Sequence, residues 1–145
     1  MRRKHIVQFV LLFSLLLLIL VSCASRKVVG LEQGWDVLGE MKVNFLRDKD
    51  VLEVKNSTPY TAIRFKVEDQ DVRINYVKVV FANGDKLEPA IDEVITAGQT
   101  SGIIDLGREG RSISAVEFKY RSMGNILGGR ANVVVIARRY DPYRY

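Results

Sequence analysis

The feature that most constrains the fold is an alternation of apolar and polar side chains that recurs from Gly34 onward. It is clearest in residues 62–68, where Ile63, Phe65 and Val67 are separated by charged residues. Successive side chains of a β-strand point to opposite faces of a sheet, so this period of two predicts a strand buried on one face. After residue 23, no segment shows a helical repeat over about eleven residues or more. The chain is therefore predicted to be all-β.

Turn signals between the alternating runs predict how the strands are connected. Asn83-Gly84 is the strongest hairpin signal in the chain, because this dipeptide suits the central positions of a tight β-turn. Pro89 predicts a position at the edge of a sheet. The predicted strands cover residues 35–45, 51–54, 62–68, 72–81, 86–90, 101–106, 113–120 and 132–137. Short strands at this spacing predict an antiparallel sandwich or barrel, and we expect a β-sandwich of about eight or nine strands.

Three positions interrupt the alternation. A change of phase near Tyr76 predicts a bulge or two facing sheets, and the phase shifts again at Ser114 and Ala115. Gly39 predicts a bend or bulge in the first strand. The buried face of that strand is predicted to carry Val37, Met41, Val43 and Phe45.

An apolar segment precedes the alternating region and is interpreted as a targeting signal. The run from Ile6 to Val21 follows three basic residues, Arg2, Arg3 and Lys4. Its length of about sixteen residues spans roughly 24 Å as a helix, whereas the core of a bilayer is about 30 Å thick. A signal helix that is cleaved fits this segment better than a membrane span. An uncleaved membrane helix is the alternative.

The end of this segment, Leu20-Val21-Ser22-Cys23, resembles the lipobox of bacterial lipoproteins. The resemblance implies that residues 1–22 are removed and that Cys23 carries a diacylglycerol and an amide-linked acyl chain such as palmitate. Two or more acyl chains hold a protein on a bilayer almost permanently. Residues 23–33 would then form a lipidated tether, residues 34–138 the β-sandwich domain and residues 139–145 a basic and aromatic tail.

The residue after the predicted lipidation site bears on the location. Asp is the usual signal for retention at the inner membrane in bacterial lipoproteins, and this chain has Ala24 at that position. The resemblance therefore implies a cell-envelope lipoprotein. In a Gram-negative host it favours the outer membrane, on its periplasmic face or at the cell surface.

Composition excludes several kinds of catalysis once the signal is removed. The full chain has 22 basic and 17 acidic residues, and loss of its three N-terminal cations leaves 19 against 17, a net charge of +2. That value gives no argument for nucleic-acid binding, which needs a clustered basic face. His5 and Cys23 are the only histidine and cysteine, so a Ser-His-Asp triad, a thiol nucleophile and a Cys/His zinc site are excluded. We expect no enzyme activity, cofactor or metal.

Short motifs of turn and core residues mark the domain. They are Trp35-Asp36-x-Leu38-Gly39, Asp48-x-Asp50, Phe81-x-Asn83-Gly84, Ile104-Asp105-Leu106, Arg111-x-Ile113 and Ala131-x-Val133-x-Val135. On these motifs, residues 34–138 resemble small secreted bacterial β-sandwich domains without an assigned activity, and the resemblance implies no catalytic residues. Within them, Trp35 is predicted to cap the core where the tether enters. Asp105 and Arg111 are predicted to pair across a glycine-rich turn and to join two strands.

These observations predict an envelope protein that is held on the lipid bilayer through Cys23. Its domain would be structural or would bind a protein or glycan partner near the membrane. The 122–129 loop holds Met123, Ile126 and Leu127, which bind a partner if exposed and plug the sandwich if folded back. The tail alternates cations with aromatic rings, which suits contact with sugars or anionic lipids. A disordered or edge-packed tail is the plainer interpretation.

Two further functions are alternatives. An enzyme inhibitor would insert the 122–129 loop into its target. A carboxylate-based glycan hydrolase would need two carboxyl groups about 5–10 Å apart in one cleft. Its candidate residues are Asp36, Asp48, Asp50, Asp69, Asp71, Asp92 and Asp105.

Overall fold

The computed structural model describes residues 31–43, 49–123 and 130–143, and these form nine antiparallel strands. The prediction of an all-β antiparallel fold is confirmed. The predicted signal helix, Cys23 and most of the predicted tether lie outside the described residues. The strands are β1 (Trp35–Lys42), β2 (Lys49–Glu53), β3 (Pro59–Glu68), β4 (Val72–Phe81), β5 (Lys86–Leu87), β6 (Glu93–Ile95), β7 (Ile104–Asp105), β8 (Arg111–Ser122) and β9 (Asn132–Arg139).

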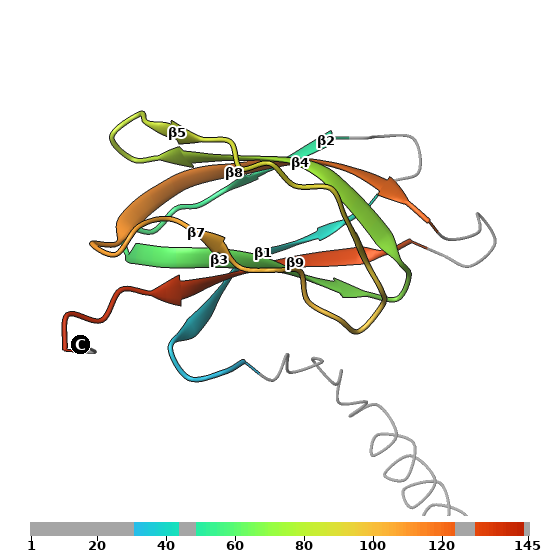
Figure 1. Ribbon diagram of the computed structural model, residues 1–145, viewed down its shortest axis with the longest axis horizontal. Coiled ribbons are helices and arrows are strands. Elements are labelled where there is room, and N and C mark those ends of the chain that lie inside the picture. The colour runs from blue at the N-terminus through green and yellow to red at the C-terminus, as the bar shows by residue number, and fades with distance from the viewer. Residues whose placement is uncertain (1–30, 44–48, 124–129, 144–145) are drawn as a thin grey trace, which may run out of the picture. The chain divides into compact units, whose positions relative to one another are not determined.

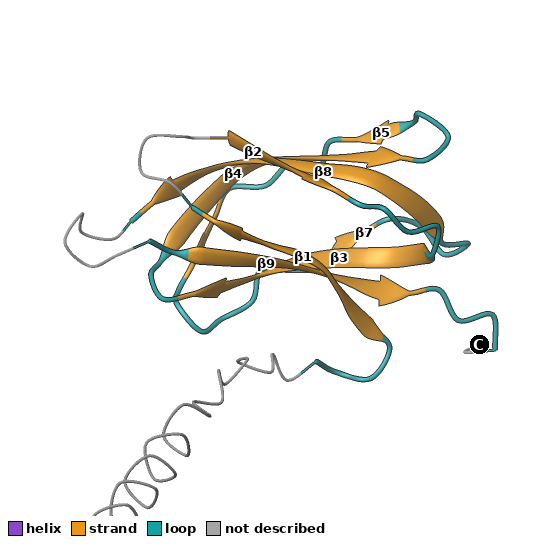
Figure 2. Cartoon of the chain, turned by 180° about the vertical axis from the view of Figure 1, so that it is seen from behind, coloured by secondary structure: helices purple, strands orange, loops and turns teal. Residues whose placement is uncertain are grey.

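The strands lie in two layers that face each other (Figure 1). One layer has the order β1-β9-β3-β7, and in the other β2 and β4 flank β8, with β5 and β6 paired to β4. The start of β3 also pairs with the start of β8, at Pro59 and Tyr60, and this pairing joins the two layers at one end. Figure 2 shows the same two layers from behind. Among the described residues, no helix has the length and apolar character needed to cross a membrane.

The core lies between the layers and follows the predicted alternation. Ile63, Phe65 and Val67 of β3 are all fully buried there. The ring of Phe65 lies 5.3 Å from that of Phe118 on the opposite layer, and Phe118 lies 5.7 Å from Tyr120. Burying each such side chain contributes about 1.5–3 kcal/mol relative to leaving it exposed. The contacts between these aromatic rings therefore hold the two layers together.

The first strand departs from its predicted pattern. The predicted bulge is present, because the register of β1 against β9 shifts between Val37 and Gly39. The bulge reverses the phase, so the prediction that Val37 is buried is wrong: its side chain is 44% exposed. Leu38 packs against the core in place of Val37, and Met41 packs against it as predicted. Val43 is buried as predicted, and Phe45 lies outside the described residues.

Gly39 packs closely against the side chain of Leu52 on β2. A Cβ atom there would lie 2.5 Å from the Cδ1 atom of Leu52 on β2. The small residue thus lets the first strands of the two layers approach each other.

The predicted hairpin and the two predicted changes of phase are confirmed. Gly84 adopts a φ of 88° in the turn between β4 and β5, and its amide donates to the carbonyl of Phe81. The register between β4 and β8 shifts near Tyr76 and again opposite Ser114. The predicted strand 86–90 ends at Leu87, because Pro89 has no amide hydrogen to donate to a neighbour. The predicted strand 101–106 is likewise reduced to Ile104–Asp105.

An ion network crosses the outer face of the second layer. The carboxylate of Glu117 on β8 contacts the amines of Lys49 at 2.9 Å and Lys78 at 3.2 Å. Hydrogen bonds to these lysines hold the pKa of Glu117 below its usual value. These ion pairs therefore connect the neighbouring strands β2, β8 and β4 to one another.

Candidate functional site

A second, smaller apolar cluster lies on the outer face of the first layer. It consists of Trp35, Ala62, Val134 and Ile136, which alternate along their strands with residues of the main core. Trp35 is 8% exposed, so its ring is not an open stacking surface. The predicted capping role placed Trp35 on the core between the layers, and the structure places it on this outer cluster.

Two arginines pack on the ring of Trp35. The guanidinium carbon of Arg64 lies 4.2 Å from the ring centroid, and that of Arg138 lies 5.8 Å from it. A guanidinium over an indole ring is attracted by the electron-rich face of the ring. Arg64 also contacts the carboxylate of Glu32 at 3.3 Å, just before β1 begins. The tryptophan therefore orients two cations on this face of the sheet.

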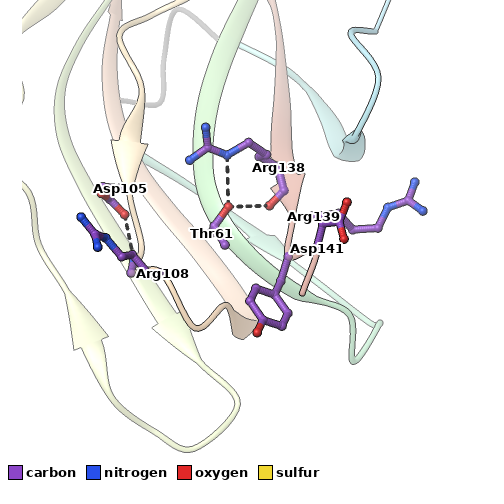
Figure 3. Close-up of a pocket in the computed structure, with 8 residues that line it drawn as sticks. Thr61, Asp105, Arg108, Arg138, Arg139 and Asp141 are labelled. Carbon is purple, nitrogen blue, oxygen red and sulfur yellow. Dashed lines mark hydrogen bonds between the residues drawn. The ribbon is translucent and has the colours of Figure 1, made fainter. Parts of the chain in front are cut away.

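An open cleft of about 310 Å³ begins beside Arg138. It lies where β3 begins and β9 ends, and the turn after β7 forms its far side (Figure 3). Its lining residues are Thr61, Asp105, Gly107, Arg108, Arg138, Arg139, Tyr140 and Asp141. The cleft thus combines three guanidinium groups with two hydroxyls and two carboxylates.

Arg138 is held in the cleft by hydrogen bonds with Thr61. Its Nε donates to the hydroxyl oxygen of Thr61 at 3.1 Å, and that hydroxyl donates back to the Arg138 carbonyl at 3.4 Å. Both its hydrogen-bond partner and the ring of Trp35 are neutral, and no carboxylate within the described ranges pairs with this guanidinium. Arg138 is only partly exposed. Arg138 therefore lines the cleft without a counterion among the described residues.

Arg139 is directed to the other side of the strand in Figure 3. It contacts the carboxylate of Asp36 on β1 at 2.6 Å. This hydrogen bond, together with the negative charge of Asp36, raises the pKa of Arg139 above its ordinary value. The positive charge of Arg139 is thus already balanced by the carboxylate of Asp36 on the neighbouring strand, unlike that of Arg138.

The two carboxylates of the cleft are engaged in local turns. Asp105 accepts a hydrogen bond from the amide of Gly107 at 2.8 Å, and Asp141 accepts one from the amide of Tyr143 at 2.9 Å. A short polar side chain that bonds the backbone two residues onward stabilises a turn. Both carboxylates therefore stabilise their turns whether or not a ligand is bound.

One wall of the cleft is fixed by a glycine. Gly110 has a φ of 66°, and a Cβ atom there would lie 2.5 Å from the Cβ of Tyr140. The amide of Tyr140 donates to the carbonyl of Pro59 at 2.9 Å. The close approach of Tyr140 to the β7–β8 turn thus requires the absence of a side chain at position 110.

A second, shallower hollow lies on the other layer. It has a volume of about 470 Å³ and is lined by Asn75, Tyr76, Glu88, Pro89, Ala90, Ile91 and Asp92. Asp92 is paired there with Arg73 through two hydrogen bonds. Of the seven aspartates considered for a glycan hydrolase, Asp48 lies outside the described residues. Of the other six, the first cleft contains only Asp105 and the second only Asp92. Within the described part of the chain, no three acidic, histidine or cysteine residues are grouped to hold a metal.

The predicted pair of Asp105 and Arg111 is wrong. Arg111 pairs instead with Asp85 of the β4–β5 hairpin, and its guanidinium lies 3.5 Å from the centroid of the Phe81 ring. The φ of 109° at Gly107 allows the chain to turn back, so Asp105 bonds to its own turn. Both residues still stabilise turns next to strands.

The predicted partner-binding loop is described only at its start. Met123 follows β8 and is 51% exposed, whereas Ile126 and Leu127 lie outside the described residues.

The tail was predicted from its alternating cations and aromatic rings, and its residues Arg139, Tyr140 and Asp141 line the cleft. The contributions of Thr61 and Arg108 were not predicted. No local pattern indicated them, because they reach the cleft only through strand pairing.

The fold and the cleft define a small antiparallel β-sandwich domain with an arginine-lined cleft on one layer. The chain belongs to the family described as a domain of unknown function, DUF2541, whose profile matches residues 10–137. No curated protein matches the chain.

Several solved structures share part of this architecture. AlgX of Pseudomonas aeruginosa has a TM-score of 0.43 at 11% identity, over 80% of this chain and 27% of AlgX, so this chain spans about a quarter of it. A mutant of a family 29 carbohydrate-binding module has a TM-score of 0.37 at 14% identity, over 77% of this chain and 84% of the module. A protein from E. coli strain K12 has a TM-score of 0.37 at 15% identity, over 73% and 85% of the two chains. At these scores the likenesses carry no conclusion about ligand or activity.

Proposed function

We propose that the protein is a membrane-anchored envelope lipoprotein whose domain binds, without catalysis, a glycan that carries anionic groups. The binding site is the cleft beside Arg138. The observation that carries the proposal is the partly exposed guanidinium of Arg138, which borders this cleft with only neutral partners within the described residues.

An ordered cation without a counterion favours an anionic ligand. Removing a charge from water is costly unless an opposite charge or several hydrogen bonds replace the lost hydration. A guanidinium offers paired N–H donors that match carboxylate and phosphate oxygens. Arg138 is held in place before any ligand arrives, so binding needs little further ordering of this side chain.

The surroundings of Arg138 suit a sugar. Thr61 and Tyr140 supply hydroxyl groups, and Arg108 adds a second exposed cation at the rim. The volume of about 310 Å³ is at the lower end of the range of small-ligand sites. A cleft that is open to solvent can accept one unit of a longer polymer. An envelope location, inferred from the lipobox resemblance at Cys23, would bring the domain close to such polymers.

The side chains present favour binding over catalysis. The only histidine and cysteine are at positions 5 and 23, outside the domain. Asp105 and Asp141, the carboxylates in the cleft, each hold a backbone amide of their own turn. A hydrolase needs one carboxyl group that donates a proton and a second that attacks or activates water. Because each of these carboxylates already bonds its own turn, we do not expect one to act as proton donor and the other to attack or activate water.

Binding can be measured through the protein's own fluorescence. Trp35 is the only tryptophan, and it lies against Arg138. The full-length protein in detergent micelles would be titrated with an oligogalacturonate, and with its fully methyl-esterified form as a neutral ligand of equal length. We expect saturable changes with the charged form only, and loss of binding in Arg138→Gln.

The matched control is Arg73→Gln on the other layer, where an exposed arginine pairs with Asp92. This variant should bind like the unaltered protein. Equal binding by Arg138→Gln, or absence of binding to the charged ligand, would refute the proposed site.

The anchor is tested separately by mass spectrometry of the native protein. We expect an N-terminal Cys23 that carries acyl chains, and a Cys23→Ser variant that leaves the membrane fraction. A native product that starts at Met1 without acyl chains would contradict this part of the proposal.

A further inference from the structure

We infer that the cleft is specific for a carboxylate, as in a sugar acid, and discriminates against a phosphate ester. This inference rests on the proposed function, because it concerns the same site. It follows from the number of donors that Arg138 has left and from the charges around them.

The hydrogen bond to Thr61 limits how Arg138 can be approached. A guanidinium has five N–H donors, one on Nε and four on the two terminal nitrogens. The Nε donor is used by the Thr61 hydroxyl at 3.1 Å. The two terminal nitrogens remain, and together they present a planar fork at the end of the side chain. A planar carboxylate fills such a fork with its two oxygens.

The charges around the cleft favour the anion with the smaller charge. Three arginines and two aspartates line it, and one of the arginines, Arg139, is already paired with Asp36 on β1. With Asp36 included these charges sum to zero, so no net positive charge is left to balance a second negative charge on a ligand. A carboxylate carries one negative charge, whereas a phosphate monoester carries about 1.5 to 2 near neutral pH.

The second charge of a phosphate would have no partner of its own. Asp105 and Asp141 border the same space, so the extra charge would be repelled there. A repulsion across a solvated cleft of this size corresponds to a loss of about threefold to tenfold in affinity. Arg108 at the rim offsets part of this repulsion. If the Arg108 side chain approaches the ligand, we expect the loss in affinity to lie at the lower end of the threefold to tenfold range.

Thr61 acts in this scheme as a positioning residue. Its hydroxyl oxygen holds Nε and so fixes which edge of the guanidinium faces the cleft. Thr61→Val keeps the shape of the side chain but removes the acceptor. The variant should still bind anions, because Arg138 remains, but its preference for carboxylate over phosphate should decrease. If Thr61 had only a structural role, the Thr61→Val substitution would weaken binding of the carboxylate and of the phosphate equally.

The test uses three sugars that differ only at carbon 6: glucose, glucuronate and glucose 6-phosphate. Each competes with bound oligogalacturonate on the full-length protein at constant ionic strength and pH 7.5. We expect glucuronate to compete about threefold to tenfold better than glucose 6-phosphate, and glucose to compete least. Lowering the pH to 5 reduces the phosphate to a single charge, so glucose 6-phosphate should then approach glucuronate.

The outcomes separate this inference from the proposed function. Equal or stronger competition by glucose 6-phosphate at pH 7.5 would overturn the carboxylate preference while leaving anion binding in place. If neither anion competes better than glucose, the proposed function itself fails. An unchanged ratio of the two anions in Thr61→Val would remove Thr61 from the account of specificity.

Discussion

Replacing Gly110 by alanine should destabilise the domain and deform the cleft at the same time. The backbone at this position has a φ of 66°, which costs a residue with a Cβ atom about 1–2 kcal/mol. Alanine also restricts the unfolded chain, which returns about 0.4–1 kcal/mol. The net backbone cost is therefore about 1 kcal/mol.

A steric cost adds to this backbone cost. The new Cβ would lie 2.5 Å from the Cβ of Tyr140, 2.8 Å from its Cγ and 3.2 Å from the Cβ of Pro59. These atoms belong to the rigid base of a ring and to a proline, so the tyrosine must move as a unit. Losing most of its packing costs about 2 kcal/mol. The total destabilisation is about 3 kcal/mol, or roughly 12 °C in Tm for a domain of this size.

Gly84→Ala provides the matched control. Gly84 also has a positive φ, of 88°, but a Cβ there would meet nothing within 4 Å. It should therefore show only the backbone cost, about 1 kcal/mol or roughly 4 °C in Tm. Thermal unfolding followed by circular dichroism measures both, and oligogalacturonate binding should weaken only in Gly110→Ala. Equal Tm values for the two variants would refute the claim that Tyr140 is seated against position 110.

Four further substitutions test the fold and its ion network. Phe65→Ala should lower the free energy of unfolding by about 3–5 kcal/mol in a denaturant titration, because its fully buried ring contacts the opposite layer. Val37→Thr should change stability by less than about 0.5 kcal/mol, whereas Val43→Thr should cost more, since only Val43 is buried. Glu117 has a lowered pKa in the folded state, so its stabilising effect is present above the carboxyl's ordinary pKa and is lost as pH falls below it. The difference in Tm between the unaltered protein and Glu117→Gln should shrink as the pH is lowered from 7 to 3.

The predictability of each strand depended on whether its pattern stayed in phase. β3 was predicted well, because Ile63, Phe65 and Val67 face the core while charged residues face the other way without interruption. In β1 the extra residue at the bulge inverted the assignment of Val37. A sequence can indicate that a glycine bends a strand, but the residue at which the phase reverses depends on the register with β9. That register is a property of the folded sheet.

The cleft was harder to predict than the fold, because its parts are far apart in the chain. Thr61 and Arg138 are 77 residues apart and are brought together only by the pairing of β3 with β9. The composition of the tail did indicate cations and rings near residue 140, but it gave no reason to separate Arg138 from Arg139. Their difference comes from the sheet: Asp36 on β1 reaches Arg139, while Arg138 is left with a hydroxyl and an aromatic ring.

That difference also explains how one small domain can be both stable and ready to bind. Several charged groups on the first layer are paired within the protein, as in the contacts of Arg64 with Glu32 and of Lys66 with Glu68. Solvent-accessible pairs of this kind add little stability each, but they leave fewer charges available to a ligand. Among the described residues Arg138 differs from these, because Thr61 and Trp35 fix its position without neutralising it. Specificity for an anion therefore depends on which neighbours lack a charge, as much as on the arginine itself.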